Sequence, residues 1–151
     1  MSLFNGLNIS ASGLTANRLR MDVVSSNIAN ANTTRAELVN GEWVPYRRKS
    51  VQLSQSGISP FQQQLQSAMS KGNSQVSGVS VSKIEEDPTP FVQTYDPTNA
   101  DADENGYVQS PNVDPIKEMV DLMSATRSYE ANVTAMNASK SMFMQALEIG
   151  K

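Results

Sequence analysis

The sequence contains no cysteine and no histidine. Without cysteine the chain has no disulfide, no thiolate zinc site and no cysteine nucleophile. Without histidine it has no imidazole metal ligand and no Ser-His-Asp triad. Catalysis by carboxylates alone is still open.

Charged and apolar residues are both scarce. Charged residues make up 18% of the 151 residues and apolar residues 38%, and 20 Ser and 13 Asn fill much of the difference. The net charge is −3, which argues against a nucleic-acid partner because phosphates require a basic surface. We therefore expect a chain with a thin core that buries little surface on its own.

No apolar run is long enough for a membrane helix, so we expect no membrane insertion. The first basic residue is Arg18, and polar residues and glycines interrupt the segment before it. This start does not fit a secretory signal. If the protein leaves the cytoplasm, we expect a route that needs no cleaved signal.

Apolar residues near the N-terminus predict a helix over residues 3–31. One seam of this helix repeats every seven residues, at Leu7, Leu14, Met21 and Ile28. The second seam position is mostly small or polar, as at Ser10 and Asn17, although Val24 also lies there. Gly6 and Gly13 each cost about 1 kcal/mol relative to Ala, so the helix should be marginal alone.

A second, longer helix is predicted over residues 114–149. Asp114 can cap it, Pro115 suits its first turn, and Glu118 favours its positive end. One face follows spacings of three and four residues, at Ile116, Met119, Met123, Thr126, Tyr129, Val133, Met136, Lys140, Phe143 and Leu147. At about 1.5 Å per residue this helix is about 50 Å long, so it needs a long companion, and the N-terminal helix is the obvious one.

The middle of the chain is punctuated by proline and predicts short strands. Candidates are residues 43–46, 50–53, an alternating stretch with Val76, Val79, Val81 and Ile84, and 91–95. Residues 61–72 are rich in Gln and Ser and predict a loop. The predicted fold class is α+β, with the terminal helices packed as a coiled-coil-like hairpin around a small β-rich insert. We divide the chain into an N-terminal helical assembly segment (1–34), a β-rich middle domain (35–110) and a C-terminal helical assembly segment (111–151).

Two acidic stretches are candidate sites. Residues 101–106 begin like a calcium loop, but the twelfth position is Asn112 and not a bidentate Glu, so a turn centred on Gly106 is the plainer interpretation. Adjacent carboxylates at Glu85, Glu86 and Asp87 point in different directions. We therefore expect a solvated loop and no catalysis there.

Two further features favour contacts with partners. Arg47, Arg48 and Lys49 form the only basic cluster, which is either a solvated strand end or a grip on an acidic partner or cell-wall material. Five methionines lie in the last helix, and Met adapts to different neighbours. They serve either as core filler or as an assembly surface.

Segments at both ends resemble the paired terminal signatures of flagellar axial proteins, which are rod, hook and hook-associated subunits. They are residues 12–14 (SGL), 21–24 (MDVV), 25–33 (SSNIANANT), 111–120 (PNVDPIKEMV) and 127–133 (RSYEANV). The size of the insert and the stretches 106–108 (GYV) and 140–142 (KSM) are most similar to the proximal-rod subunits of this family.

The resemblance implies a structural subunit of the bacterial flagellar basal body that self-assembles helically through its terminal helices and transmits torque. It implies export through the flagellar type III apparatus, and as partners further copies, other rod proteins and the rod-base adaptor. No cofactor, metal or small-molecule substrate is implied. The expected assembly interface consists of Leu7, Leu14, Met21, Val24, Asn27, Ile28, Asn30, Ile116, Met119, Met123, Tyr129, Asn132, Val133, Met136, Phe143 and Leu147.

Two other functions compete with this one. A soluble coiled-coil module that binds a partner through a closed helical hairpin would fold fully as a monomer. A carboxylate enzyme would need a pocket that holds a carboxylate of raised pKa.

Overall fold

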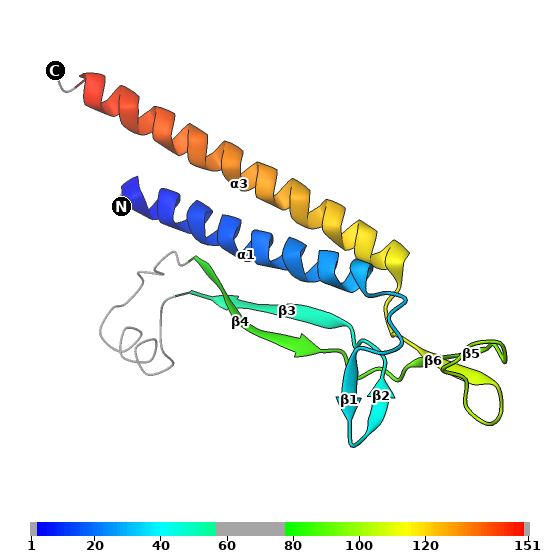
Figure 1. The fold of residues 1–151 in the computed structure, drawn as a ribbon. Coiled ribbons are helices and arrows are strands. Elements are labelled where there is room, and N and C mark those ends of the chain that lie inside the picture. Colours follow the sequence, from blue (N-terminus) through cyan, green and yellow to red (C-terminus); the bar gives the residue numbers. More distant parts are fainter. Residues whose placement is uncertain (1–2, 57–77, 150–151) are drawn as a thin grey trace. The chain divides into compact units, whose positions relative to one another are not determined.

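A computed structural model describes residues 3–56 and 78–149 of the chain. Its elements, in order, are α1 (Leu3–Ala29), β1 (Glu37–Val39), β2 (Glu42–Val44), β3 (Lys49–Gln55), β4 (Val79–Glu86), β5 (Val92–Tyr95), β6 (Tyr107–Ser110) and α3 (Pro115–Ile149), as Figure 1 shows. Two long helices therefore enclose small strand pairs in the sequence, which confirms the predicted α+β class. The predicted loop at residues 61–72 and Val76 lie outside the described residues.

The helix boundaries follow from local chemistry. The Asp114 carboxylate accepts hydrogen bonds from the backbone N–H groups of Ile116 (2.9 Å) and Lys117 (3.3 Å), which confirms the predicted cap. Pro115 is the first residue of α3, where a missing N–H costs nothing. The helix α1 ends at Ala29, two residues before the predicted end, and the Asn30 side chain then donates to the Ser26 carbonyl (2.9 Å).

The strands form three separate two-stranded sheets, β1–β2, β3–β4 and β5–β6. Two strands were missed by the sequence prediction, β1 and β6. The turn between β1 and β2 is Asn40-Gly41, with φ of 54° and 92°. The second turn contains Gly106, with φ of 79°, and precedes β6. Both turns use the left-handed backbone that Gly and Asn tolerate best.

The chain folds as two compact units, and each unit combines segments from the N-terminal and C-terminal halves of the sequence. Unit 1 contains Met1–Leu19, Gln52–Lys83 and Thr126–Lys151, and unit 2 contains Arg20–Val51 and Ile84–Ala125. The division into segments 1–34, 35–110 and 111–151 stays a prediction.

In unit 1, α1 and α3 are antiparallel neighbours held close by glycine (Figure 1). A Cβ atom on Gly6 would lie 3.7 Å from Ser139 Oγ, and one on Gly13 would lie 3.1 Å from the Asn132 amide. Seven residues forward along α1 thus correspond to seven residues back along α3, which is the two-turn repeat expected for paired helices.

Another side of α1 in unit 1 meets the start of β4. The backbone N–H of Val79 donates to Ser12 Oγ (3.1 Å), and Gly78 leaves no room there for a Cβ atom. In this unit α1 therefore lies between α3 and a strand.

The core is thin in the described residues. The buried apolar side chains are Ala16, Val24, Tyr46, Val108 and Ala125, whereas seventeen large apolar side chains are exposed. This agrees with the low apolar content of the sequence. A chain with so many exposed apolar groups has surface left for other contacts.

Candidate assembly interface

An apolar stripe lies exposed on the first third of α3. It consists of Ile116 (74% exposed), Met119 (50%), Val120 (55%) and Met123 (59%), and we call these four residues the α3 stripe. Spacings of three, one and three residues place them on one face of the helix. Three of them are predicted interface residues, and Val120 is an addition from the structure.

The opposite face of this part of α3 points into unit 2. Glu118 and Ala125 have exposed fractions of 0% and 1%. They lie about half a turn away from the α3 stripe at 100° per residue. The helix is thus anchored on one side and leaves the α3 stripe without a partner inside unit 2.

Further along α3, in unit 1, the exposed apolar side chains are Met142, Met144, Leu147 and Ile149. Leu147 is a predicted interface residue. The other predicted residues of this part are half-buried, namely Tyr129, Asn132, Val133, Met136 and Phe143. Four of the five methionines of α3 are therefore exposed, including the two in the α3 stripe.

The predicted interface residues of α1 are less accessible. Val24 and Asn27 are buried, and the others are half-buried, namely Leu7, Leu14, Met21, Ile28 and Asn30. No large apolar side chain in the described part of α1 is among the exposed ones. A role for these residues between copies stays a prediction, since each of them is already at least partly buried within the chain.

A buried polar cluster in unit 2 is centred on Asn27, near the end of α1. Its Nδ2 donates to the Lys49 carbonyl (2.8 Å) and to Glu118 Oε2 (2.9 Å). Its Oδ1 accepts from the Lys49 N–H (3.0 Å) and from the Tyr46 hydroxyl (3.0 Å). All four hydrogen-bonding positions of the amide are used, which fixes its orientation.

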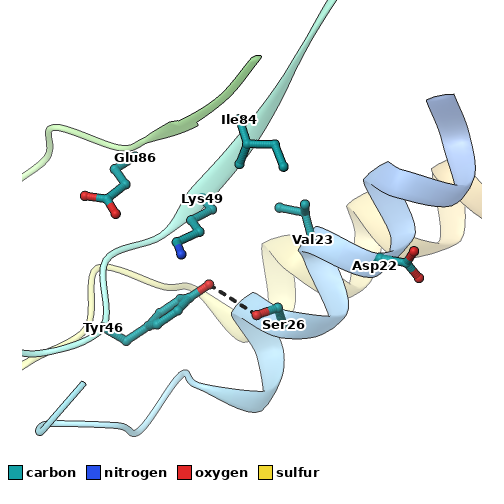
Figure 2. A pocket seen from close by; sticks show the side chains of 7 residues that line it. All are labelled: Asp22, Val23, Ser26, Tyr46, Lys49, Ile84 and Glu86. Carbon is teal, nitrogen blue, oxygen red and sulfur yellow. Dashed lines mark hydrogen bonds between the residues drawn. The ribbon is translucent and has the colours of Figure 1, made fainter. Parts of the chain in front are cut away.

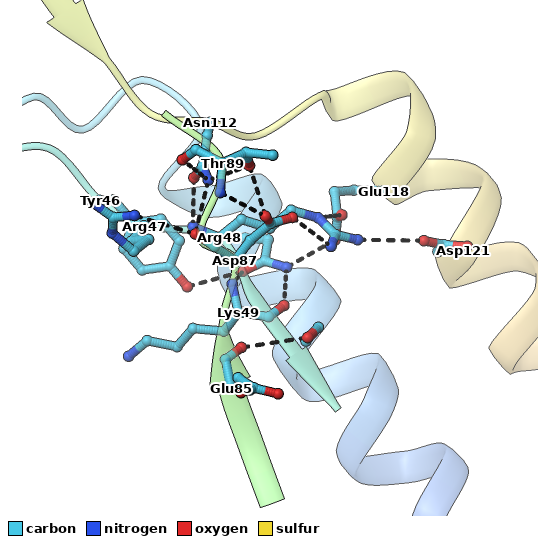
Figure 3. Close-up of polar contacts among 12 residues, drawn as sticks. Tyr46, Arg47, Arg48, Lys49, Glu85, Asp87, Thr89, Asn112, Glu118 and Asp121 are labelled. Atoms are coloured by element: carbon cyan, nitrogen blue, oxygen red, sulfur yellow. Dashed lines mark hydrogen bonds and ion pairs between the residues drawn. The ribbon is translucent and has the colours of Figure 1, made fainter. Parts of the chain in front are cut away.

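Arg48 neutralises the buried carboxylate of Glu118 in this cluster. Its Nε lies 2.7 Å from Glu118 Oε1, and its guanidinium also lies 3.4 Å from Asp87 and 3.7 Å from Asp121 (Figure 3). Burial lowers the pKa of Arg48, but the hydrogen bond to Glu118 and the three nearby carboxylates outweigh burial and raise it overall. Arg48 therefore stays charged and holds three acidic residues together.

Asn112 connects the cluster to the segment that follows β4. Its Oδ1 accepts from the Arg48 N–H (2.8 Å), and its Nδ2 donates to the Thr89 hydroxyl (2.9 Å) and the Asp87 carbonyl (3.3 Å). Two hydrogen bonds from Thr89, one from its hydroxyl and one from its N–H, are the main cause that lowers the pKa of Asp87, and Arg48 adds to this. The polar cluster thus joins four segments that are distant in sequence.

A cavity of about 440 Å³ lies beside α1 in unit 2 (Figure 2). Its lining carries both signs of charge and is formed by Asp22, Val23, Ser26, Tyr46, Lys49, Ile84 and Glu86. The three adjacent carboxylates of the sequence do not converge on it. Glu86 lines the cavity, Asp87 belongs to the polar cluster, and the Glu85 carbonyl accepts from Ser50 Oγ (3.4 Å).

The acidic loop before β6 is a turn. Asp103 Oδ1 accepts from the N–H groups of Asn105 and Tyr107, both at 2.9 Å. Asp101 binds the Thr34 hydroxyl (2.7 Å) and Arg35, and these two hydrogen bonds lower its pKa. In residues 3–56 and 78–149 no three acidic, His or Cys side chains are gathered as a metal site.

The basic cluster does not form one surface. The Arg47 guanidinium lies over the Phe91 ring, 4.5 Å from its centroid, and donates to the Asp87 carbonyl (3.3 Å). Arg48 turns into the polar cluster, and Lys49 lies over the Tyr46 ring at 5.8 Å. Arg48 is therefore a structural residue, which the interpretation as a solvated strand end did not anticipate.

The polar cluster is what sequence reasoning missed. Glu118 was assigned only to the helix dipole, although it is seven residues before Ala125 and thus on the same inward face. A carboxylate on a buried face requires a cation, and this rule could have led to Arg48. Neither of the described helices, α1 or α3, combines the length and the apolarity that crossing a membrane requires.

Comparisons with known proteins match both ends of the chain to flagellar families. Residues 7–36 match the family described as "Flagella basal body rod protein", and residues 104–149 match "Flagellar basal body rod FlgEFG protein C-terminal". The chain is 65% identical to the flagellar basal-body rod protein FlgC of Bacillus subtilis over the full length of both. It is 43% identical to FlgC of Borreliella burgdorferi, over 99% of this chain and 98% of the relative, and 38% identical to FlgC of Salmonella typhimurium over the full length of both.

Proposed function

This chain belongs to the FlgC family of flagellar basal-body rod proteins, and from that premise we propose that the α3 stripe is a surface through which it assembles. It is a structural subunit and not an enzyme, and it belongs to the flagellar basal body, where it assembles with other rod components. The alternative of a soluble partner-binding module is not favoured, because the full-length relatives are rod proteins.

The observation that carries the proposal is the exposure of four apolar side chains on one face of α3. Burying a side chain of this size is worth about 1.5–3 kcal/mol. Since each of the four is at least half exposed, covering the α3 stripe would contribute on the order of 5 kcal/mol before the costs of association. In a polymer this contribution recurs with every subunit added.

The finer parts of the function belong to the same proposal. The terminal helices assemble helically, with coiled-coil-like contacts to further copies, to other rod proteins and to the rod-base adaptor. The chain passes through the flagellar type III export apparatus without a cleaved signal. The thin core supports this route, since a chain with few buried apolar residues has little packing to lose when it unfolds.

The test is a charge placed on the α3 stripe by Met123→Asp. Because Met123 is 59% exposed, the substitution should leave the fold of the single chain unchanged. Buried at an interface, the new carboxylate would cost several kcal/mol, so rods should not form. The readouts are immunoblotting of the exported protein, electron microscopy of basal bodies and motility.

Ser128→Asp is the matched control. Ser128 is also on α3, exposed and about 140° away from Met123 around the helix, and it receives the same charge. We expect Met123→Asp to be exported but to leave cells without rods, and Ser128→Asp to give normal rods. Normal rods with Met123→Asp would contradict the assignment of the α3 stripe as an assembly surface.

A further inference from the structure

We propose that Asn40, in the turn between β1 and β2, is a site of covalent modification at which the side-chain amide is hydrolysed to aspartate and isoaspartate. The reaction needs no enzyme, and water is its only co-reactant. The site lies in unit 2 but outside the α3 stripe, so the proposal stands or falls independently of the proposed function.

The chemistry is that of an asparagine followed by a glycine. The backbone nitrogen of Gly41 attacks Cγ of Asn40, a C–N bond forms, and the bond from Cγ to Nδ2 breaks, so that ammonia leaves with the proton of the Gly41 N–H. Water then opens the five-membered succinimide ring at either of its two carbonyl carbons. One opening gives aspartate and the other gives isoaspartate, in which the main chain runs through the former side chain. Glycine favours the attack because it has no Cβ atom to obstruct the nitrogen.

The sequence contains this pair three times, at residues 5–6, 40–41 and 105–106, so the structure has to distinguish them. The ring can close only when the backbone of the pair leaves a helix or a tight turn. The rate at each pair therefore follows how easily that part of the chain opens locally. The pair at Asn5 lies in α1 and in unit 1, where the helix has to unwind first. The comparison that isolates the effect of a turn is that between Asn40 and Asn105, which both lie in unit 2.

The turn at Asn40 has little support from its surroundings. Its sheet consists of two strands of three residues each, and every residue in them except Val44 is exposed. Within residues 3–56 and 78–149, neither the Asn40 side chain nor the Gly41 N–H has a hydrogen-bond partner. Apart from its chain neighbours, no described residue comes within 4 Å of a Cβ atom placed on Gly41. A two-stranded hairpin is marginal on its own, so this turn should open readily.

The turn at Asn105 is held in place by Asp103. The Gly106 N–H, which carries the attacking nitrogen, donates to the Asp103 carbonyl (2.9 Å). The Asp103 carboxylate also accepts from the N–H groups of Asn105 and Tyr107, both at 2.9 Å. A Cβ atom on Gly106 would lie 3.0 Å from a ring carbon of Tyr95, so this turn is also packed. The same sequence pair is therefore protected here.

Conversion of Asn40 would change the hairpin that carries it. It adds a carboxylate between Glu37 and Glu42, in a segment that is already acidic. Isoaspartate also adds an atom to the main chain of a two-residue turn, whose geometry depends on loop length. The nearby pairing of Leu38 with Trp43 should therefore loosen, and a chain that is not replaced should accumulate this change with age.

The experiment ages the purified chain in a mildly alkaline buffer and then digests it with trypsin. Cleavage after arginine and lysine places the three pairs in separate peptides, 1–18, 36–47 and 84–117. Mass spectrometry measures the conversion of amide to acid, and chromatography separates the aspartate and isoaspartate peptides. We expect Asn40 to convert about tenfold faster than Asn105, because hydrogen bonds to Asp103 must break before the second turn can open. Equal rates, or a faster conversion at Asn105, overturn the inference.

Unfolding the chain in urea separates the effect of structure from that of sequence. Both asparagines precede a glycine, so their rates should become similar once the two turns are lost. A preference for Asn40 that persists unchanged in urea comes from neighbouring residues and also overturns the inference.

Asp103→Ala tests the protection of the second turn directly. The substitution removes the carboxylate that accepts from Asn105 and Tyr107, so conversion at Asn105 should accelerate while the rate at Asn40 stays the same. If Asp103→Ala leaves the rate at Asn105 unchanged, hydrogen bonding does not set these rates and the inference is wrong.

Discussion

Arg48→Met should be the most destabilising single substitution in unit 2. Arg48 is the cation that faces the carboxylate of Glu118, whose side chain has no exposed surface. Methionine has a similar length and is apolar, so the substitution removes the charge and leaves little empty space. It leaves Glu118 with the Asn27 amide as its remaining partner in the polar cluster.

The size of the effect follows from burial. Removing one partner of a buried ion pair costs about 3–5 kcal/mol, because the remaining charge is left without compensation. A domain typically has about 5–15 kcal/mol of stability in total. With five buried apolar residues in the described chain, this protein should lie at the low end, so Arg48→Met should remove most of its stability.

Urea unfolding of the purified chain, monitored by circular dichroism and by the fluorescence of Trp43, tests this loss of stability. Asp121→Asn is the control, because Asp121 is 42% exposed and 3.7 Å from Arg48, and it should cost less than about 1 kcal/mol. The double substitution Arg48→Met with Glu118→Met should recover most of the loss, since no buried charge then remains. A cost below about 1 kcal/mol for Arg48→Met, or a double variant as unstable as the sum of both single variants, would refute this reasoning.

Three further predictions concern single groups. The hydrogen bonds from Thr89, and then Arg48, lower the pKa of Asp87 in the folded chain. Its carboxylate therefore stabilises the fold above its ordinary pKa of about 4, and this contribution disappears as the pH falls through the lower folded value. Thermal melts between about pH 2 and pH 6 should show a flatter acid limb for Asp87→Asn. Gly106→Ala should destabilise its hairpin more than Gly41→Ala in hydrogen exchange, because both have positive φ but only the first places a Cβ 3.0 Å from a ring carbon of Tyr95. Asp114→Ala should cost about 1 kcal/mol in urea unfolding through loss of the α3 cap, and an unchanged midpoint would contradict it.

Local signals predicted the helices well. The cap at Asp114 is a property of adjacent residues and sets the start of α3. The three- and four-residue spacing after it predicted the apolar stripe, whose first members, Ile116, Met119 and Met123, lie on the exposed face of the helix. The β1–β2 hairpin was equally local, since Asn40-Gly41 between short apolar runs is a strong turn signal. It was missed because strands of three residues give almost no alternation to detect.

The buried faces were harder to predict, because they depend on which elements meet. The seven-residue repeat of α1 pointed to Leu7 and Leu14, whereas the side chains that are most buried in this helix are Ala16, Val24 and Asn27. Small residues let helices approach closely and so become buried, although their hydrophobicity is low. The pairing of Arg48 with Glu118 joins residues 70 positions apart, and no local pattern specifies such a partner.

Asn27 also has a consequence for the edge of a sheet. Its amide donates to the carbonyl of Lys49 and accepts from the N–H of the same residue, as one rung of a neighbouring strand would do. Lys49 is the first residue of β3, whose other edge pairs with β4. An open strand edge is a template for pairing with any extended chain nearby. The helix end therefore closes this edge at its first position, and in a crowded growing assembly it keeps an unfolded neighbour from adding a strand there.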